Sequence, residues 1–392
     1  MGDLEKDIFD RISKNEVTEL KTLLLELKSG VDFVDENGMT PLQHACYKGN
    51  KEIVQMFLDR GADVNASKHE YSYTALHFAA LSGNVDVCLL LLHAGANAND
   101  TNSVGRTAAQ MASFVSNHRV VAVINNYVPK QEIEYYTVIQ GQQTEPYLPA
   151  VLLDSFHKFV IQVNMHPVKI ALTLQRLGGF ADNLKTIRKV LGLMSEHEVQ
   201  RKSDINEAMS FKFHYLGYVV SEIIKCREYF QARKEAGSEM KNDFVELFAK
   251  RVLKEGKHGI LDYLEWMIRE CVRDFPFREF TIFKQIVSQL ANKDNEGAAL
   301  DVIKWAIYGQ RGFQDTVTYC SSCGEEKPDK KCSKCKEVQY CDRECQRLHW
   351  FMHKKTCTRP EALATNASGG GPSKKEVDVE HISSELQNLM TN

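Results

Sequence analysis

Apolar residues in the first third of the chain form pairs of short helical stripes that return at a nearly constant interval. Thr40 and Thr74 lie 34 residues apart, as do Gly61 and Gly95, and Thr107 follows Thr74 after 33 residues. Self-similarity at a period of roughly 20 to 50 residues is typical of solenoids. Each unit of a solenoid buries its apolar face only by stacking on its neighbours. The pattern therefore predicts a stack of helix pairs over residues 1–128.

Start and stop signals divide this segment further. Thr40 is the expected N-cap of a short helix, and Pro41 takes its first position, where its missing N–H is not needed. Gly49 and Gly83 are expected to end the first helix of their units with a positive φ. Gly61 is expected to end a second helix. Each unit is therefore predicted to be a helix, a turn and a second helix.

The residues at these positions resemble ankyrin repeats: Thr-Pro-Leu-Gln-His-Ala at 40–45 and Thr-Ala-Leu-His-Phe-Ala at 74–79. The resemblance implies about four repeats, the first a degenerate cap, that bind proteins through a concave surface. Gln43 and Gln110 stand where the family usually has histidine and only His77 keeps it, so we expect weaker loop networks at the two glutamines. Sixteen acidic residues against eleven basic ones in this segment favour basic partners. An unrelated helical bundle is the alternative.

Residues 129–319 have helical periodicity and few helix breakers, so they are predicted to form an all-helical middle domain. Trp266 and Trp305 fall on apolar stripes and are expected in its core. This stretch has no metalloprotease, nucleophile-elbow, phosphate-loop or dinucleotide-binding motif, and we assign no catalytic residue. The domain is either a scaffold that joins two binding modules or a spacer with no partner of its own. Helices are expected at 151–163, 170–177, 213–224, 244–253, 260–268, 280–290 and 298–307.

Seven of the eleven cysteines crowd between Cys320 and Cys357. An odd number of cysteines cannot all pair internally, and the N-terminus has no apolar signal core, so metal ligation is favoured over disulfides. Eight ligands within 38 residues suffice for two closed tetrahedral zinc sites, although the spacing alone leaves their pairing open. Cys341 and Cys345 have three residues between them, as do His353 and Cys357, so each of these two x3 pairs could lie on one helical face. The eight ligands are Cys320, Cys323, Cys332, Cys335, Cys341, Cys345, His353 and Cys357.

The spacing and the residues between the ligands resemble a MYND zinc finger, at residues 320–357. This resemblance implies interleaved sites, with Cys320, Cys323, Cys341 and Cys345 on one zinc and Cys332, Cys335, His353 and Cys357 on the other. Four protein ligands per ion make both zinc ions structural, and metal binding supplies the folding energy of so small a module. His349 is expected not to be a ligand. The resemblance also implies that Gln346 and Trp350 line a groove for proline-rich peptides; alternatively, Trp350 packs over the zinc core.

Charge and hydropathy exclude several classes of protein. The net charge is −3, and no uncharged apolar run approaches the roughly 18 residues of a membrane span. Residues 320–359 hold ten basic and six acidic side chains, but seven thiolates and two Zn²⁺ lower their net charge from +4 to about +1. We therefore expect no nucleic-acid partner and no membrane-spanning segment. Residues 358–392 are predicted to be a flexible tail, with a short amphipathic helix on binding as an alternative for 377–390.

The order of these parts resembles the family of proteins that combine ankyrin repeats with a C-terminal MYND finger. The resemblance implies a non-enzymatic adaptor, cytoplasmic and associated with cilia. Such an adaptor helps deliver membrane cyclases, or their trafficking factors, to the cilium, and so affects cyclic-nucleotide and Hedgehog signalling. One alternative is a nuclear corepressor adaptor for proline-rich partners. A remote one is a MYND-containing lysine methyltransferase, but SET catalytic domains are mostly strand and residues 129–319 are predicted to be helical.

Overall fold

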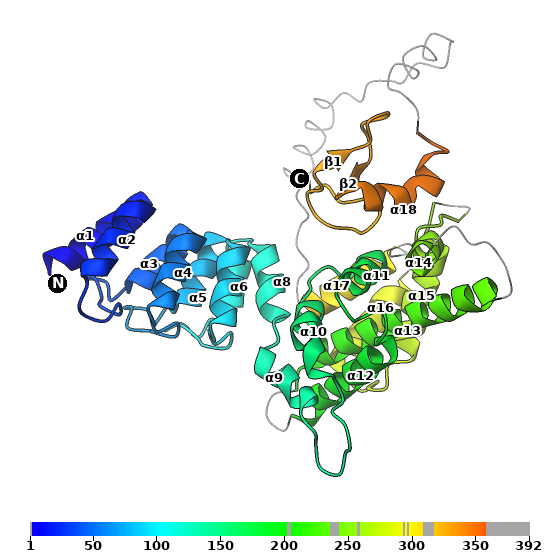
Figure 1. The fold of residues 1–392 in the computed structure, drawn as a ribbon, viewed down its shortest axis with the longest axis horizontal. Helices are drawn as coiled ribbons and strands as arrows, with labels where there is room; N and C mark the ends of the chain where they lie inside the picture. The colour runs from blue at the N-terminus through cyan, green and yellow to red at the C-terminus, as the bar shows by residue number, and fades with distance from the viewer. Residues whose placement is uncertain are drawn as a thin grey trace, which may run out of the picture.

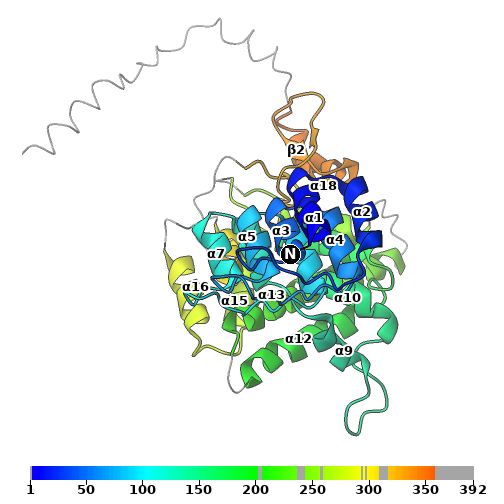
Figure 2. The ribbon, with the colours of Figure 1, turned by 90° about the vertical axis from the view of Figure 1, so that its left-hand side faces the viewer.

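The computed structural model describes residues 2–201, 205–235, 243–256, 259–292, 295, 298–308 and 317–357. A row of helix pairs leads into a larger body of helices, and a small C-terminal unit lies against that body (Figure 1). Figure 2 views the row of helix pairs from its N-terminal end. The predicted mostly helical fold class is confirmed. The alternative tail helix at 377–390 lies outside the described residues.

Four helix pairs make up the N-terminal stack. Buried side chains from successive pairs, among them Leu42, Phe57, Leu76 and Val87, join in one hydrophobic cluster, as expected of stacked repeats. The helices are α1 (Asp3–Lys14), α2 (Val17–Glu26), α3 (Pro41–Lys48), α4 (Lys51–Asp59), α5 (Ala75–Ser82), α6 (Val85–His93), α7 (Ala108–Phe114) and α8 (His118–Asn125).

The predicted start and stop signals of the repeats are confirmed. The Thr40 hydroxyl accepts a hydrogen bond from the Gln43 backbone N–H, and Pro41 opens α3. Gly49 and Gly83 end α3 and α5 with φ values of 72° and 73°. A glycine adopts this left-handed conformation without the strain that a Cβ would bring.

The expected weakening of the hairpin network at Gln43 is wrong. The Gln43 side-chain amide donates to the carbonyl oxygens of Ala66 (2.8 Å) and Tyr73 (2.9 Å), and its carbonyl accepts from the Thr40 N–H (2.8 Å). At the equivalent place in the next repeat, His77 Nε2 lies 3.0 Å from the Arg106 carbonyl oxygen. An amide offers two N–H donors and an acceptor, so it connects neighbouring hairpins as well as the imidazole does.

The middle of the chain is helical, and two of its helices were not foreseen by the sequence patterns: the five-residue α9 and one much longer helix. The longer helix, α12, runs beside α13, where the hydroxyls of Ser195 and Ser210 each donate to the other's carbonyl oxygen at 2.9 Å. The helices are α9 (Lys130–Glu134), α10 (Leu153–Val160), α11 (Pro167–Arg176), α12 (Leu184–Gln200), α13 (Glu207–Glu235), α14 (Phe244–Val252), α15 (Asp262–Arg273), α16 (Thr281–Ala291) and α17 (Ala299–Tyr308), with short 3₁₀ turns at Tyr135–Thr137 and Ala150–Leu152.

The expected core position of Trp266 is wrong, because its side chain is 47% exposed on α15. Its ring packs on Tyr263, with the centroids 5.5 Å apart, at the edge of the helical body. Trp305 on α17 is partly buried and packs against the core as expected. Helical spacing alone cannot separate the centre of an apolar stripe from its margin.

A second hydrophobic cluster begins at Val128 and includes side chains of the helical body and of the C-terminal unit as far as Cys357. The repeat stack meets this body at the end of α8. There the Asn125 side-chain amide donates to the Tyr308 carbonyl oxygen at 3.3 Å, and Lys212 Nζ donates to the Asn126 carbonyl oxygen at 3.4 Å. Residues 320–357 therefore share a core with the helical body, whereas the repeats have a core of their own. No helix in the part of the chain that the structure describes has the length and apolar character needed to cross a bilayer.

Candidate metal centre and its docking on the helical body

The C-terminal unit is built from tight turns, one small hairpin and one helix. Strands β1 (Lys330–Lys331) and β2 (Gln339–Tyr340) pair in antiparallel fashion. Helix α18 (Arg343–His353) follows, and the Asp342 carboxylate caps it by accepting from the Cys345 N–H at 2.8 Å. A carboxylate is the favoured cap because it accepts from an otherwise unpaired N–H at the positive end of the helix dipole.

Two separate groups of four ligands form within this unit. The ligand atoms of each group lie within 4.8 Å of one another, and the side chains are buried except for the half-buried Cys341. One group is Cys320, Cys323, Cys341 and Cys345, and the other is Cys332, Cys335, His353 and Cys357. These are the interleaved sets that the resemblance to MYND fingers implied.

The distances between ligand atoms fit tetrahedral zinc. Bonds of about 2.3 Å from zinc to sulfur place the sulfur atoms of a regular tetrahedron roughly 3.8 Å apart. Cys323 Sγ lies 3.6 Å from Cys341 Sγ and 3.7 Å from Cys345 Sγ, and the Sγ atoms of Cys332 and Cys357 are 3.8 Å apart. His353 Nε2 lies 3.3 Å from Cys332 Sγ, in keeping with the shorter bond of zinc to nitrogen. The two groups fit two structural zinc ions, each with four protein ligands.

Helix α18 supplies one ligand to each site. Neither x3 pair therefore lies on one helical face, although the sequence spacing allowed it. Cys345 and His353 lie on the helix, whereas Cys341 precedes it and Cys357 follows it. Each pair thus spans an end of α18, so that both ends of the helix are tied to a metal site. Two bound zinc ions would fix the position of α18 at both ends, as expected for a module whose folding depends on metal.

His349 lies on α18 outside both ligand groups. Its Nδ1 is 3.0 Å from the Tyr340 hydroxyl, and its ring stacks at 6.1 Å on His353. Burial lowers the pKa of His349, so the imidazole is neutral at pH 7. His349 thus contacts Tyr340 and the ligand His353 without belonging to either ligand group.

The sequence candidates for peptide binding, Gln346 and Trp350, lie one helical turn apart on α18. Trp350 is 44% exposed, and its ring meets the His353 ring edge-on at a centroid distance of 5.9 Å. The indole therefore touches a zinc ligand with one part and leaves another part open to solvent. Gln346 is half-buried beside it.

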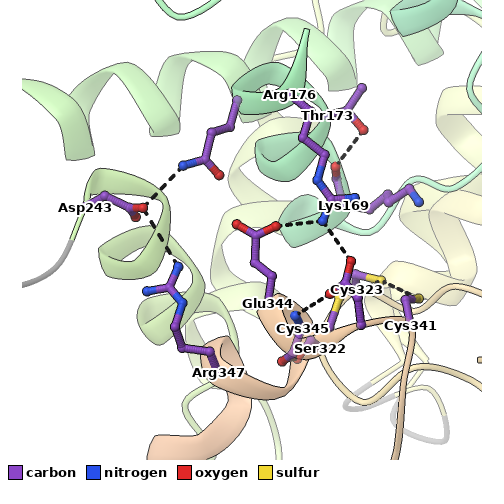
Figure 3. Close-up of polar contacts among 12 residues, drawn as sticks. Lys169, Thr173, Arg176, Asp243, Ser322, Cys323, Cys341, Glu344, Cys345 and Arg347 are labelled. Atoms are coloured by element: carbon purple, nitrogen blue, oxygen red, sulfur yellow. Dashed lines mark hydrogen bonds and ion pairs between the residues drawn. The ribbon is translucent and has the colours of Figure 1, made fainter. Parts of the chain in front are cut away.

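Charged side chains fix the finger on the helical body (Figure 3). Arg176 on α11 lies 2.6 Å from Glu344 and 2.9 Å from Asp342 of the finger. Lys169 on the same helix lies 2.7 Å from Glu325. Arg347 on α18 pairs with Glu246 of α14 and lies 3.9 Å from Asp243. These partners stand far apart in the sequence, so no local pattern could have predicted the contact.

The first zinc site lies directly at this interface. The Asn164 side-chain amide donates to the Cys323 carbonyl oxygen at 3.1 Å. Gly324 has a φ of 64°, and a Cβ at this position would lie 3.2 Å from a ring carbon of His166. Burial lowers the pKa of His166 to about 3, so its ring is neutral and its Nδ1 can accept from the Val168 N–H at 3.2 Å. The close approach and the positive φ both favour glycine at this position.

Comparison with known proteins agrees with both modules. Residues 11–102 match the family model of ankyrin repeats (3 copies), and residues 320–357 match that of the MYND finger. Human ankyrin repeat and KH domain-containing protein 1 is 41% identical over 90 residues, which is 23% of this chain and 4% of that protein. Mouse protein fem-1 homolog A-like is 32% identical over 120 residues, 31% of this chain and 18% of its own length. Each of these two alignments covers less than a third of this chain.

A nematode relative aligns over nearly the full length. The Caenorhabditis elegans protein named Dauer abnormal formation protein 25 is 32% identical over 372 residues, which is 92% of each chain. The alignment therefore covers the helical body as well as the two modules. Ankyrin repeats and MYND fingers are both protein-interaction modules, and together they indicate protein partners. The chain belongs to the family of this nematode protein, and it carries ankyrin repeats followed by a C-terminal MYND finger.

Proposed function

We propose that this protein is a non-enzymatic adaptor that binds one partner through its repeats and a proline-rich peptide through its finger. The observation that carries the proposal is the exposed face of Trp350 on α18. The Glu344 and Arg347 side of the same helix is occupied by the helical body, while Trp350 stays open to solvent. The docked finger thus keeps its candidate groove available.

The chemistry of this groove suits a proline-rich segment. A flat indole face packs well on proline rings, and an extended peptide leaves backbone groups free to bond a side-chain amide. Trp350 would supply the face and Gln346 the amide. Both zinc sites have four protein ligands and so leave no position for a substrate, which supports a binding role over a catalytic one.

The wider role that we propose comes from the family. The protein would act in the cytoplasm and at the cilium, in the delivery of membrane cyclases or their trafficking factors, and so affect cyclic-nucleotide and Hedgehog signalling. Its relation to the nematode protein, at 32% identity over 92% of the chain, supports a shared role. The helical body would hold the two binding modules at fixed positions.

The test measures peptide binding and zinc content together in the full chain. A fluorescent peptide with the sequence Pro-Ala-Leu-Ala-Pro is titrated with wild type, Trp350→Ala, Gln346→Ala and the control Trp266→Ala. Trp266 is a tryptophan of similar exposure, 47%, on α15. Trp350→Ala should abolish binding with zinc near two per chain, and Trp266→Ala should bind normally. Loss of zinc from Trp350→Ala would favour the packing role, and methyl-transfer turnover by the wild type would contradict the non-enzymatic assignment.

A further inference from the structure

Five aromatic rings gather on one side of the repeat stack, and we name them the aromatic patch. His69 lies at the centre, with ring centroids 5.2 Å from Tyr73 and 5.3 Å from Phe78. Tyr71 lies 5.7 Å from His69, and Tyr47 on α3 lies 6.2 Å from Phe78 on α5. Tyr47 and Tyr71 are 57% and 53% exposed. The patch therefore exposes the rings of Tyr47 and Tyr71 to solvent, while the ring of Phe78 is buried.

The repeat architecture itself does not demand these rings. Alignment on the threonines at 40, 74 and 107 shows which residues take the same places in the neighbouring hairpins. Of these three hairpins, only that of the patch has aromatic side chains five, three and one residues before its threonine, namely His69, Tyr71 and Tyr73. The equivalent residues are Asp35, Asn37 and Met39 in the hairpin before it and Asn102, Val104 and Arg106 in the hairpin after it.

The turn that carries the patch is strained. Ser72 has a φ of 55°, where the neighbouring hairpins have Gly38 at 76° and Gly105 at 73°. A side chain at such a φ is strained and persists where the surroundings enforce it, often at binding sites. The surroundings here do so, because the Glu70 N–H donates to the Asn37 carbonyl (3.2 Å) and the Ser103 N–H donates to the Tyr71 carbonyl (3.0 Å). The turn of the patch is therefore held by backbone hydrogen bonds to both neighbouring hairpins.

The charge around the patch favours a cation. Residues 35–38 and 68–72, the two turns that meet beside it, carry the carboxylates of Asp35, Glu36 and Glu70 against one ammonium, that of Lys68. Residues 1–128 as a whole carry sixteen acidic and eleven basic side chains. Burial lowers the pKa of His69, so its ring is neutral at pH 7 and does not repel a cation.

We infer that the aromatic patch binds an arginine side chain in an extended, basic segment of a partner protein. A guanidinium stacks on aromatic faces and is held there by the ring quadrupole, and nearby carboxylates add attraction. The exposed rings of Tyr47 and Tyr71 are the faces on which the guanidinium would stack. The carboxylates of Glu36 and Glu70, in the two turns beside the patch, would attract it. The inference rests on the proposed role of the repeats as a protein-binding module and specifies the chemistry of their partner.

The experiment compares three labelled nine-residue peptides on the full-length, zinc-loaded protein: glycine alternating with arginine, with lysine or with glutamate. Cation–π contacts are worth about 0.5 to 2 kcal/mol, or roughly 2- to 30-fold in affinity. The arginine peptide should bind best and the glutamate peptide worst. Tyr71→Leu and Tyr47→Leu should each weaken arginine binding by roughly that factor, while Tyr71→Phe, which keeps the ring, should bind within about twofold of wild type.

The matched control is Tyr135→Leu, since Tyr135 is 52% exposed but belongs to the helical body. It should leave arginine binding unchanged. Equal binding of the arginine and glutamate peptides would overturn the inference, and so would equal losses in Tyr71→Phe and Tyr71→Leu. Trp350→Ala should keep arginine binding while it loses the proline-rich peptide. Failure at the patch can thus be told apart from failure of the groove in the finger.

Discussion

Arg176 on α11 lies 2.6 Å from Glu344 on α18, although 168 residues of chain separate them. The same guanidinium reaches Asp342, the residue that caps α18 through the Cys345 N–H. The Asp342 carboxylate therefore connects the docking of the finger to the helix that carries the zinc ligands Cys345 and His353. The finger and the helical body form a joint unit in which charged side chains orient α18 and bound zinc would order it.

We predict that Arg176→Glu loosens the finger without releasing zinc. Exposed ion pairs are worth about 0.2 to 1 kcal/mol each, and the reversal replaces two attractions by two repulsions of similar size, for a total of about 1 to 4 kcal/mol. Hydrogen exchange should rise in α18 and α11, with zinc still near two per chain. Lys185→Glu is the control, since Lys185 pairs with Glu228 within the helical body. Pairing the reversal with Glu344→Arg should restore part of the protection, and an unchanged exchange rate in Arg176→Glu would refute the prediction.

The sequence predicted the repeats and the zinc ligands because both depend on residues close together in the chain. A Cys-x2-Cys knuckle such as Cys320 and Cys323 is a local geometry, and so is the turn at Gly49. The docking of Arg176 on Glu344 is not local, and neither residue differs in type from an ordinary surface charge. It became visible only when the fold placed α11 beside α18.

The wrong predictions for Trp266 and Gln43 have similar physical causes. Trp266 has the spacing of a core residue but lies at the margin of its stripe, where one side of the ring stays in water. Gln43 was expected to weaken a network built for histidine, yet an amide supplies donors and an acceptor in the same directions. Periodicity and residue type describe a position along a helix, but they do not describe what packs on it from elsewhere.

The two zinc sites should differ in how they affect the helical body. Cys323 lies at the interface, where its carbonyl accepts from Asn164, whereas Cys335 belongs to the site formed with His353. Cys323→Ser and Cys335→Ser should each lower the zinc content by at least one ion per chain, because a tetrahedral site loses most of its affinity with one thiolate. Only Cys323→Ser should raise hydrogen exchange in residues 164–176, and the rise should be visible at short labelling times. Equal exchange there in the two variants would show that the sites act as one.

Glycines in two hairpins give a matched test of how tightly the repeats stack. A Cβ on Gly38 would lie 2.3 Å from the Lys68 carbonyl oxygen, whereas one on Gly105 would meet nothing within 4 Å. Both glycines have positive φ, 76° and 73°, so alanine strains each by about 1 to 2 kcal/mol. Gly38→Ala must also push neighbouring backbone aside, and should cost a further 1 kcal/mol or more (about 2 to 4 in total). Thermal unfolding of the two variants measures the difference, and equal melting temperatures would mean that the hairpins separate easily.

Lys212 gives the junction between the repeats and the helical body a predictable pH dependence. The side chain is fully buried on α13, and its Nζ donates to the Asn126 carbonyl oxygen. Burial lowers the pKa of Lys212 to about 7, against roughly 10.4 in an unfolded chain. Between these two values the unfolded chain binds a proton that the folded protein does not. The free energy of unfolding that this group contributes therefore rises with pH across that window.

Replacement by methionine removes the titration and keeps most of the side-chain volume. Lys212→Met should therefore be more stable than wild type by a few kcal/mol below about pH 7, where the folded protein must hold a buried ammonium. Its advantage should shrink steadily as the pH rises towards about 10. Urea unfolding at about pH 6 and about pH 9 measures the change, with Lys185→Met as the control because the Lys185 side chain is 83% exposed. An advantage of Lys212→Met that stays constant between the two pH values would contradict the prediction, since it would mean that Lys212 has the same pKa in the folded and unfolded states.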